Sequence, residues 1–245
     1  PLPNQAQQWL ARQQSALRTD PQRIAGGLWE IRRQTMNNNG IVTVLGAMCG
    51  IRQRCMFCGD SHGGDIEHFR PKAVAAYRAY VFDWNNFLWL CTPCNRRKGN
   101  RLPCDEIGEP LLIDPTARDP WDHLIYIPET GELLPRYDPV SSADDRYGAA
   151  TADEALTRLN IEAVAEGRRR VVRHACRYLR LFLASAHSDA DAEPLVTSCL
   201  DLDHPELLVW FLTRDGRDTS PFAEFVADYP ALAERLLIRL DTAAP

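Results

Sequence analysis

Two cysteine pairs constrain the fold of this 245-residue chain more than any other feature of its sequence. Cys55 and Cys58 form one C-x-x-C pair, and Cys91 and Cys94 form a second after 32 intervening residues. Four thiolates in two such pairs are the ligand set of a closed tetrahedral zinc site, which leaves no open position for a substrate. We therefore expect a structural zinc ion and a long insert between its two half-sites. Coincidental pairs or buried free thiols are the alternative interpretation.

The other cysteines indicate no disulfide framework. The chain has eight cysteines and no signal-peptide pattern, which argues against oxidative cross-linking. No apolar run approaches the ~20 residues of a membrane span, so we expect a cytoplasmic protein without membrane association. The four cysteines outside the pairs are interpreted as small core side chains: Cys49, Cys104, Cys176 and Cys199.

The charge is distributed unevenly along the chain. The net charge is −5, which argues against a protein that coats nucleic acid over its whole surface. Between Cys49 and Cys104, however, nine Lys or Arg stand against four Asp or Glu, so this stretch carries +5 and the remainder −10. A basic centre in an acidic chain indicates a local anionic ligand, or else an ordinary solvated surface.

The segments on either side of the cysteine pairs have helical and hairpin patterns. Residues 5–36 are expected to form two helices that break at Asp20-Pro21, whereas residues 41–52 fit a strand or a helix equally well. A β-hairpin is expected around a turn at 128–131. From about Thr151 the chain is expected to be mainly helical.

The C-terminal region contains three helix candidates. The longest covers 159–186, and a second begins at Pro205. The third is expected near Phe222, with Ser220 as its N-cap and Pro221 in its first turn.

The insert between the cysteine pairs contains "GGDIEHFRPKA", residues 63–73, in which an acid, a histidine and a proline follow one another closely. With the cysteines and two later asparagines, this order of residues resembles the HNH (ββα-metal, His-Me finger) endonuclease family in its zinc-bearing form. The resemblance covers about fifty residues and extends to the HNH nucleases of Septu-type and retron-associated anti-phage systems. The positions that carry it are Cys55, Cys58, Glu67, His68, Pro71, Asn86, Cys91, Cys94, Asn95 and Lys98.

The resemblance implies an α+β fold in which a small zinc-stabilised ββα-metal core is flanked by helices. We predict an N-terminal helical segment at 1–48 and an HNH nuclease core with the four-cysteine zinc site at 49–112. A β-hairpin and connector is predicted at 113–150, and a C-terminal helical region at 151–245.

The same resemblance assigns roles to residues of the insert. His68 is the expected general base, since a neutral imidazole can take a proton from water near pH 7, and Asn86 is expected to orient its loop. Glu67 and Asn95 are expected to bind a catalytic Mg²⁺ or Mn²⁺. Asp65 lies two residues from Glu67 and would share its face of a strand, so we expect it to support these ligands or to be an auxiliary ligand. Asn95 stands where many members have histidine, and its amide oxygen suits a hard cation. Taken singly, each of these residues fits an ordinary surface or turn position.

Cations and aromatic residues surround this motif. Six basic residues are expected to contact the phosphates of a nucleic acid: Arg70, Lys72, Arg96, Arg97, Lys98 and Arg101. Trp84, Phe87 and Trp89 are expected to pack around the zinc module rather than to stack on bases.

The long C-terminal helix has one basic face. Arg169, Arg173, Arg177 and Arg180 recur at intervals of four, four and three residues. This face fits a surface that binds nucleic acid or an acidic partner protein. It fits an ordinary solvated helix surface equally well.

These observations favour a metal-dependent HNH endonuclease that cleaves DNA or RNA and, by the resemblance, works with an ATPase partner in bacterial defence. The alternative is a non-catalytic, zinc-stabilised adaptor that binds nucleic acid or protein.

Overall fold

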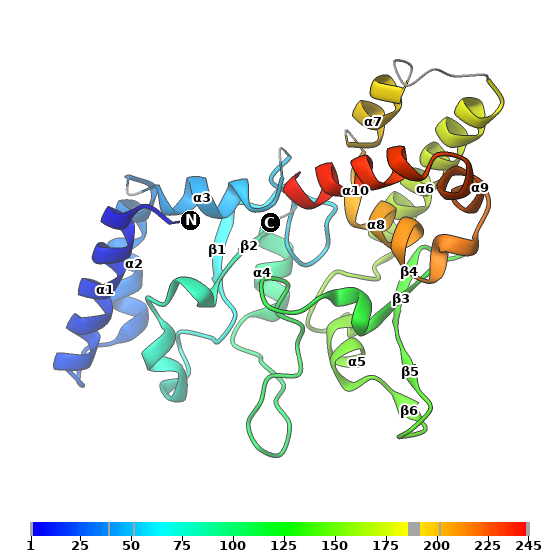
Figure 1. The fold of residues 1–245 in the computed structure, drawn as a ribbon. Coiled ribbons are helices and arrows are strands. Elements are labelled where there is room, and N and C mark those ends of the chain that lie inside the picture. Colours follow the sequence, from blue (N-terminus) through cyan, green and yellow to red (C-terminus); the bar gives the residue numbers. More distant parts are fainter. Residues whose placement is uncertain (1, 39, 51, 186–191, 201, 244–245) are drawn as a thin grey trace. The chain divides into compact units, whose positions relative to one another are not determined.

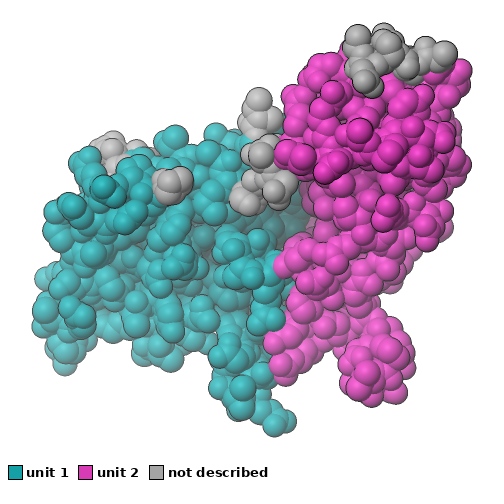
Figure 2. Space-filling view, viewed as in Figure 1, with its two compact units in different colours: residues 1–118, 155–157 teal, residues 119–154, 158–245 magenta. Residues whose placement is uncertain are grey.

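The computed structural model describes residues 2–38, 40–50, 52–185, 192–200 and 202–243. The chain forms two compact units: unit 1 contains residues 1–118 and 155–157, and unit 2 contains 119–154 and 158–245 (Figure 2). Helices and short antiparallel strand pairs alternate along the described chain (Figure 1). The α+β class expected from the sequence is therefore confirmed.

Three helices open unit 1, namely α1 (Asn4–Thr19), α2 (Ala25–Asn38) and α3 (Ile41–Ala47). The break expected at Asp20-Pro21 is confirmed, because a residue before proline avoids the helical region and Asp20 has φ −126° and ψ 87°. The segment 41–52, which fits either a helix or a strand, begins as helix α3.

A ββα unit follows in the chain. Strand β1 (Asp65–His68) pairs antiparallel with β2 (Phe87–Leu90), so that Asp65 faces Leu90 and His68 faces Phe87. Helix α4 (Thr92–Lys98) starts two residues after β2 ends. The connection between the strands contains two short 3-10 helices, η1 (Ala75–Tyr80) and η2 (Trp84–Asn86).

The ββα unit and the N-terminal helices share one hydrophobic core. Trp29 of α2 packs at ring-centroid distances of 5.6 Å from Phe82 and 5.4 Å from Phe87. Phe87 and Trp89 are buried, and Trp84 is partly buried against the same cluster, so their expected packing role is confirmed. Neither the N-terminal segment nor the ββα unit contains this core alone.

Unit 2 is built around the predicted hairpin. Strands β3 (Leu124–Ile127) and β4 (Glu132–Pro135) pair antiparallel across the turn at 128–131, which confirms the hairpin. Arg168, only 1% exposed, donates a 2.8 Å hydrogen bond to the carbonyl of Gly131 and so ties the turn to the long helix. Three small elements complete this region: β5 (Tyr137–Asp138), β6 (Ala143–Asp144) and α5 (Arg146–Ala152).

Helices form the rest of unit 2. Tyr126 of the hairpin packs against Trp210 and Phe211 at 5.6 and 5.9 Å between ring centroids, and Phe211 stacks on Phe222 at 4.3 Å. None of the described helices is both long enough and apolar enough to cross a membrane. Besides α5, the described helices of the unit are η3 (Pro120–Asp122), α6 (Glu162–Leu183), α7 (Ala192–Leu200), α8 (Pro205–Thr213), η5 (Asp215–Asp218), α9 (Phe222–Asp228) and α10 (Pro230–Ala243).

The cap predicted for α9 is wrong. Pro221 immediately precedes the helix, and no side chain caps it. The carbonyl of Thr219 accepts the N–H groups of Phe222 and Ala223, at 2.9 and 3.1 Å. A backbone carbonyl thus satisfies the donors that Ser220 was expected to satisfy.

Gly131 offers a test of the hairpin's packing on α6. Its φ is +78°, and an added Cβ would collide with the carbonyl oxygen of Ala165. Gly108 has a similar φ of +87° but open space around it. We expect Gly108→Ala to cost about 1–2 kcal/mol from the left-handed backbone alone, and Gly131→Ala to cost about 1–3 kcal/mol more from overpacking. Denaturant unfolding of both variants measures the difference, and equal costs would contradict the close packing of turn and helix.

Candidate functional site

The four cysteines of the two C-x-x-C pairs converge in one buried cluster. Their Sγ atoms all lie within 4.8 Å of one another, and the Sγ atoms of Cys58 and Cys91 are 3.9 Å apart. Zn–S bonds of about 2.3 Å in a tetrahedron place neighbouring sulfurs about 3.8 Å apart, so the cluster fits the ion. The first pair lies in the loop before β1, where Gly59 adopts φ +66°. The second pair lies at the start of α4.

The protonation of these thiols also fits a metal centre. Hydrogen bonds within the cluster raise the pKa of Cys55 and Cys94, lower that of Cys91, and lower that of Cys58 to about 7. Thiols this close cannot all ionise unless a cation compensates their charge. The cluster could hold a zinc ion, which would join the loop before β1 to α4.

The cysteines outside the cluster have a different environment. Cys199 is 1% exposed, and burial raises the pKa of Cys199 and of Cys49 to about 12. Cys49, Cys104 and Cys176 are only partly buried. The prediction of core side chains therefore holds fully for Cys199 alone.

Strand β1 presents both of its carboxylates to α4. Asp65 and Glu67 are two residues apart and therefore share one face of the strand. Asn95 Nδ2 donates to Asp65 Oδ2 at 3.2 Å, and Lys98 Nζ donates to Glu67 Oε1 at 2.9 Å. The three-residue spacing of Asn95 and Lys98 keeps both on the helix face towards the strand.

The pair of Glu67 and Lys98 is buried. The side chain of Lys98 is 0% exposed and that of Glu67 is 7% exposed, and Lys98 Nζ also donates to the carbonyl of His68 at 2.6 Å. Burial lowers the pKa of Lys98, while the Glu67 carboxylate acts in the opposite direction. Lys98 was expected to contact a phosphate, but its ammonium group is buried and bonded to Glu67 and to the carbonyl of His68. One carboxylate oxygen of Glu67 is engaged in the same ion pair.

His68 points away from the carboxylates, towards the N-terminal helices. Its ring is 0% exposed and lies 4.2 Å from the ring of Trp29 and 5.5 Å from that of Phe87, between centroids. Nε2 is 2.9 Å from the carbonyl oxygen of Val81, an acceptor, so Nε2 carries the proton in the neutral ring. Nδ1 is buried and has no hydrogen-bond partner in the described structure. Burial, with smaller effects of the nearby lysines, lowers the pKa of His68 to about 3.

Asn86 holds the loop that follows His68. Its Oδ1 accepts from the N–H of Arg70 at 2.7 Å, and its Nδ2 donates to the carbonyls of Arg70 at 3.1 Å and Tyr80 at 2.9 Å. The side chain is 1% exposed. These three bonds fix the backbone two residues beyond His68.

The predicted phosphate contacts differ in their environments. The guanidinium of Arg70 lies 4.8 Å from the centre of the Tyr80 ring, and Arg101 donates to the carbonyls of Arg97 and Ala155. Arg96 is exposed on α4, whereas Lys72 and Arg97 are partly buried. Among the six, only Lys98 is fully buried.

Sequence reasoning missed Trp29 and Val81 as neighbours of His68. Trp29 lies 39 positions before His68 in a segment that shows only a helical pattern, and the carbonyl of Val81 is a backbone group. No motif spacing signals either contact, because both arise from packing between separate elements.

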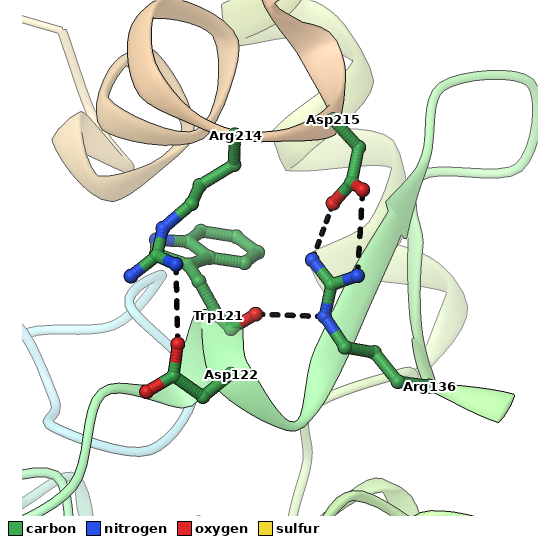
Figure 3. Close-up of a pocket in the computed structure, with 5 residues that line it drawn as sticks. All are labelled: Trp121, Asp122, Arg136, Arg214 and Asp215. Atoms are coloured by element: carbon green, nitrogen blue, oxygen red, sulfur yellow. Dashed lines mark hydrogen bonds and ion pairs between the residues drawn. The ribbon is translucent and has the colours of Figure 1, made fainter. Parts of the chain in front are cut away.

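Unit 2 has an open pocket of about 430 Å³ that the sequence did not indicate. Arg136 binds Asp215 and donates to the carbonyl of Trp121 at 2.8 Å, while Arg214 binds Asp122 at 3.1 Å (Figure 3). Both guanidinium groups are therefore occupied by acids of the same unit, and the pocket offers no free cation to a ligand.

Comparison with known proteins gives one informative match. Over 76 residues the chain is 34% identical to the Septu protein PtuB of Bacillus thuringiensis. The match covers 29% of this chain and 27% of the length of that protein. No family model matches the chain, and no solved structure matches it. The chain therefore has a partial similarity to a Septu protein.

The thiol cluster leads to a prediction on metal content. We expect about one zinc per purified chain by elemental analysis, and loss of that zinc in Cys91→Ser but not in Cys176→Ser, which lies outside the cluster. Structural zinc contributes about 10–16 kcal/mol of binding free energy in small domains, so a strong chelator should unfold the ββα unit. A chain without zinc whose melting curve is unchanged by the chelator would contradict this.

The buried ion pair leads to a second prediction. Lys98→Met should destabilise unit 1 by about 3–5 kcal/mol, because it leaves the Glu67 carboxylate buried without its partner. Adding Glu67→Gln should recover at least half of that loss. The exposed pair of Arg23 and Asp20 provides the control, and Arg23→Met should cost less than about 1 kcal/mol. Urea unfolding of the parent, the two single variants and the double variant forms the cycle, and strictly additive losses would show that the pair is not coupled.

Proposed function

We propose that this chain is a metal-dependent endonuclease of the HNH type that hydrolyses phosphodiester bonds in DNA or RNA. The observation that carries the proposal is the contact between Asp65 on β1 and Asn95 on α4, beside the four-cysteine cluster and on the strand that holds His68. A carboxylate and an amide oxygen are the donors that hard divalent cations prefer.

Asp65 and Asn95 are the residues that would hold the Mg²⁺ or Mn²⁺. They are only partly buried and contact each other, whereas Glu67 would first have to release Lys98. Asp65 therefore takes a larger role here than its sequence position predicts. When bound, such a cation supplies charge stabilisation to the phosphoryl group and the leaving oxygen.

His68 is the proposed general base, and Nδ1 is the atom that takes the proton. The carbonyl of Val81 holds the proton on Nε2, which leaves the lone pair of Nδ1 free. Asn86 keeps the following loop fixed, so the ring has a defined position. Trp29 covers this ring, and the ring lies on the face of β1 opposite to Asp65 and Asn95. The proposal therefore requires Trp29 to move and the His68 end of β1 to turn, so that Nδ1 reaches a water beside the metal ligands.

The biological role is proposed from the partial similarity to the Septu protein PtuB. We propose that the chain acts in a bacterial anti-phage defence system together with an ATPase partner. The covered His68 is compatible with an enzyme that stays inactive until its partner or substrate rearranges the N-terminal helices.

A second candidate function is a non-catalytic, zinc-stabilised adaptor that binds nucleic acid or protein. The observation that favours it is the closure of the site, since Glu67 is paired with Lys98 and His68 has no exposed surface. An adaptor would need neither residue to reach a substrate.

Nuclease assays on the full chain separate the two functions. With Mg²⁺ or Mn²⁺ and the partner ATPase present, we expect cleavage of DNA or RNA by the parent and by His62→Gln, a matched change of an exposed histidine on the same unit. His68→Gln should lose about 10²–10⁴-fold, the usual contribution of a general base. Asp65→Asn should raise the metal concentration needed for half-maximal cleavage, whereas Asp60→Asn should not.

Folding of each variant is checked by its zinc content and thermal melting. Equal cleavage by the parent and His68→Gln would overturn the assignment of the base. A folded parent that cleaves neither DNA nor RNA under any of these conditions, but still binds its partner, would establish the adaptor instead.

A further inference from the structure

Helix α6 has two opposite faces of different chemistry. The face that packs into unit 2 consists of Val164, Ala165, Arg168, Val171, Ala175, Leu179 and Phe182. At about 100° per residue, the other arginines fall within a sector of about 100° on the opposite side. This second set, which we call the α6 arginine face, consists of Arg169, Arg170, Arg173, Arg177 and Arg180.

Among the described residues, acidic side chains pair with one end of this face. Glu166 binds Arg169, and it also accepts from Arg170 at 3.2 Å and from Arg173 at 2.9 Å. No Asp or Glu occurs in 167–183, so the last turns of the helix carry Arg177 and Arg180 without an acid of the helix itself. Neither of these two arginines makes an ion pair with a described residue of the chain.

Aromatic and apolar side chains border the arginines on one side. His174 and Tyr178 are four residues apart, both are exposed, and their ring centroids are 6.3 Å apart. Tyr178 is 38% exposed and Leu181 is 60% exposed. Exposed rings beside a row of guanidinium groups suit a ligand that combines phosphates with flat bases.

We propose that the α6 arginine face binds single-stranded nucleic acid, with the arginines on the phosphates and Tyr178 and His174 on unpaired bases. Arginine binds phosphate well because its planar fork presents several donors. The net charge of the chain is −5, so the molecule as a whole repels a polyanion. A polyanion would therefore bind at a local basic surface. The proposal does not require the chain to be a nuclease.

Fluorescence anisotropy on the full chain tests this, with labelled 20-nucleotide single-stranded DNA and RNA and without added Mg²⁺. The double variant Arg177→Glu/Arg180→Glu should bind at least about tenfold more weakly in low salt. Its slope of log affinity against log salt should fall by about 1.4, since each lost phosphate contact removes about 0.7 for a single strand. The control Arg217→Glu/Arg235→Glu changes the net charge equally at two exposed arginines of unit 2 and should bind like the parent.

Base stacking is tested separately from charge. Tyr178→Ala should weaken single-strand binding by about tenfold, within the ~1–3 kcal/mol that one stacked base contributes, and should leave duplex binding unchanged. Binding is measured without Mg²⁺ and needs no cleavage, so a failure of the proposed nuclease chemistry would not be confused with a failure of this surface.

Three results would overturn the proposal. Equal weakening by the two double variants would mean that only bulk charge matters. Equal affinity for single strands and duplexes, with no effect of Tyr178→Ala, would show that the aromatic rings do not stack on unpaired bases. No binding by the parent, together with loss of an acidic partner protein from Arg177→Glu/Arg180→Glu, would assign the face to a protein interface.

Discussion

The alternation of side chains along β1 is the constraint on which the rest of unit 1 depends. Successive residues of a strand point to opposite faces, so Glu67 must face α4 when His68 faces the N-terminal helices. The pair between Glu67 and Lys98 fixes this choice, because a one-residue slip would bury His68 against a cation and leave the carboxylate among aromatic rings. A buried ion pair adds little net stability, but each partner without the other is costly. We infer that its main effect here is to specify the register.

The four-cysteine cluster makes such a small unit possible. Helix α4 has seven residues and each strand has four, too little to bury a core of its own. The cluster joins the loop before β1 to the start of α4, and the aromatic core supplied by α2 covers the other side, where Trp29 meets Phe87. The four-cysteine cluster and the N-terminal helices thus hold opposite faces of the same hairpin.

Local pattern and motif spacing predicted much of the fold. The spacing of the cysteines predicted the cluster, Asp20-Pro21 predicted the end of the first helix, and the turn residues at 128–131 predicted the hairpin. Each of these signals lies within a few neighbouring residues. The environments of Lys98 and His68 were not predictable in this way. A lysine beside two arginines in sequence has the signature of a basic surface, and its burial depends on a carboxylate 31 positions away. Likewise, the cover over His68 comes from Trp29, whose own segment shows only helical periodicity.

The buried nitrogens of Lys98 and His68 are not equivalent. Lys98 is compensated by a carboxylate and a carbonyl, whereas Nδ1 of His68 has no partner among the described residues, a state that costs about 1–3 kcal/mol. An apolar ring would avoid this cost at a purely structural position, and this is the physical ground on which His68 is proposed as the base. Two of the cations near His68 already have partners within the chain. Arg70 lies over the ring of Tyr80, and Arg101 donates to the carbonyl of Arg97. Affinity for a long polyanion would then come from a surface elsewhere, and Arg177 and Arg180 of α6, which make no ion pair with a described residue, would supply it.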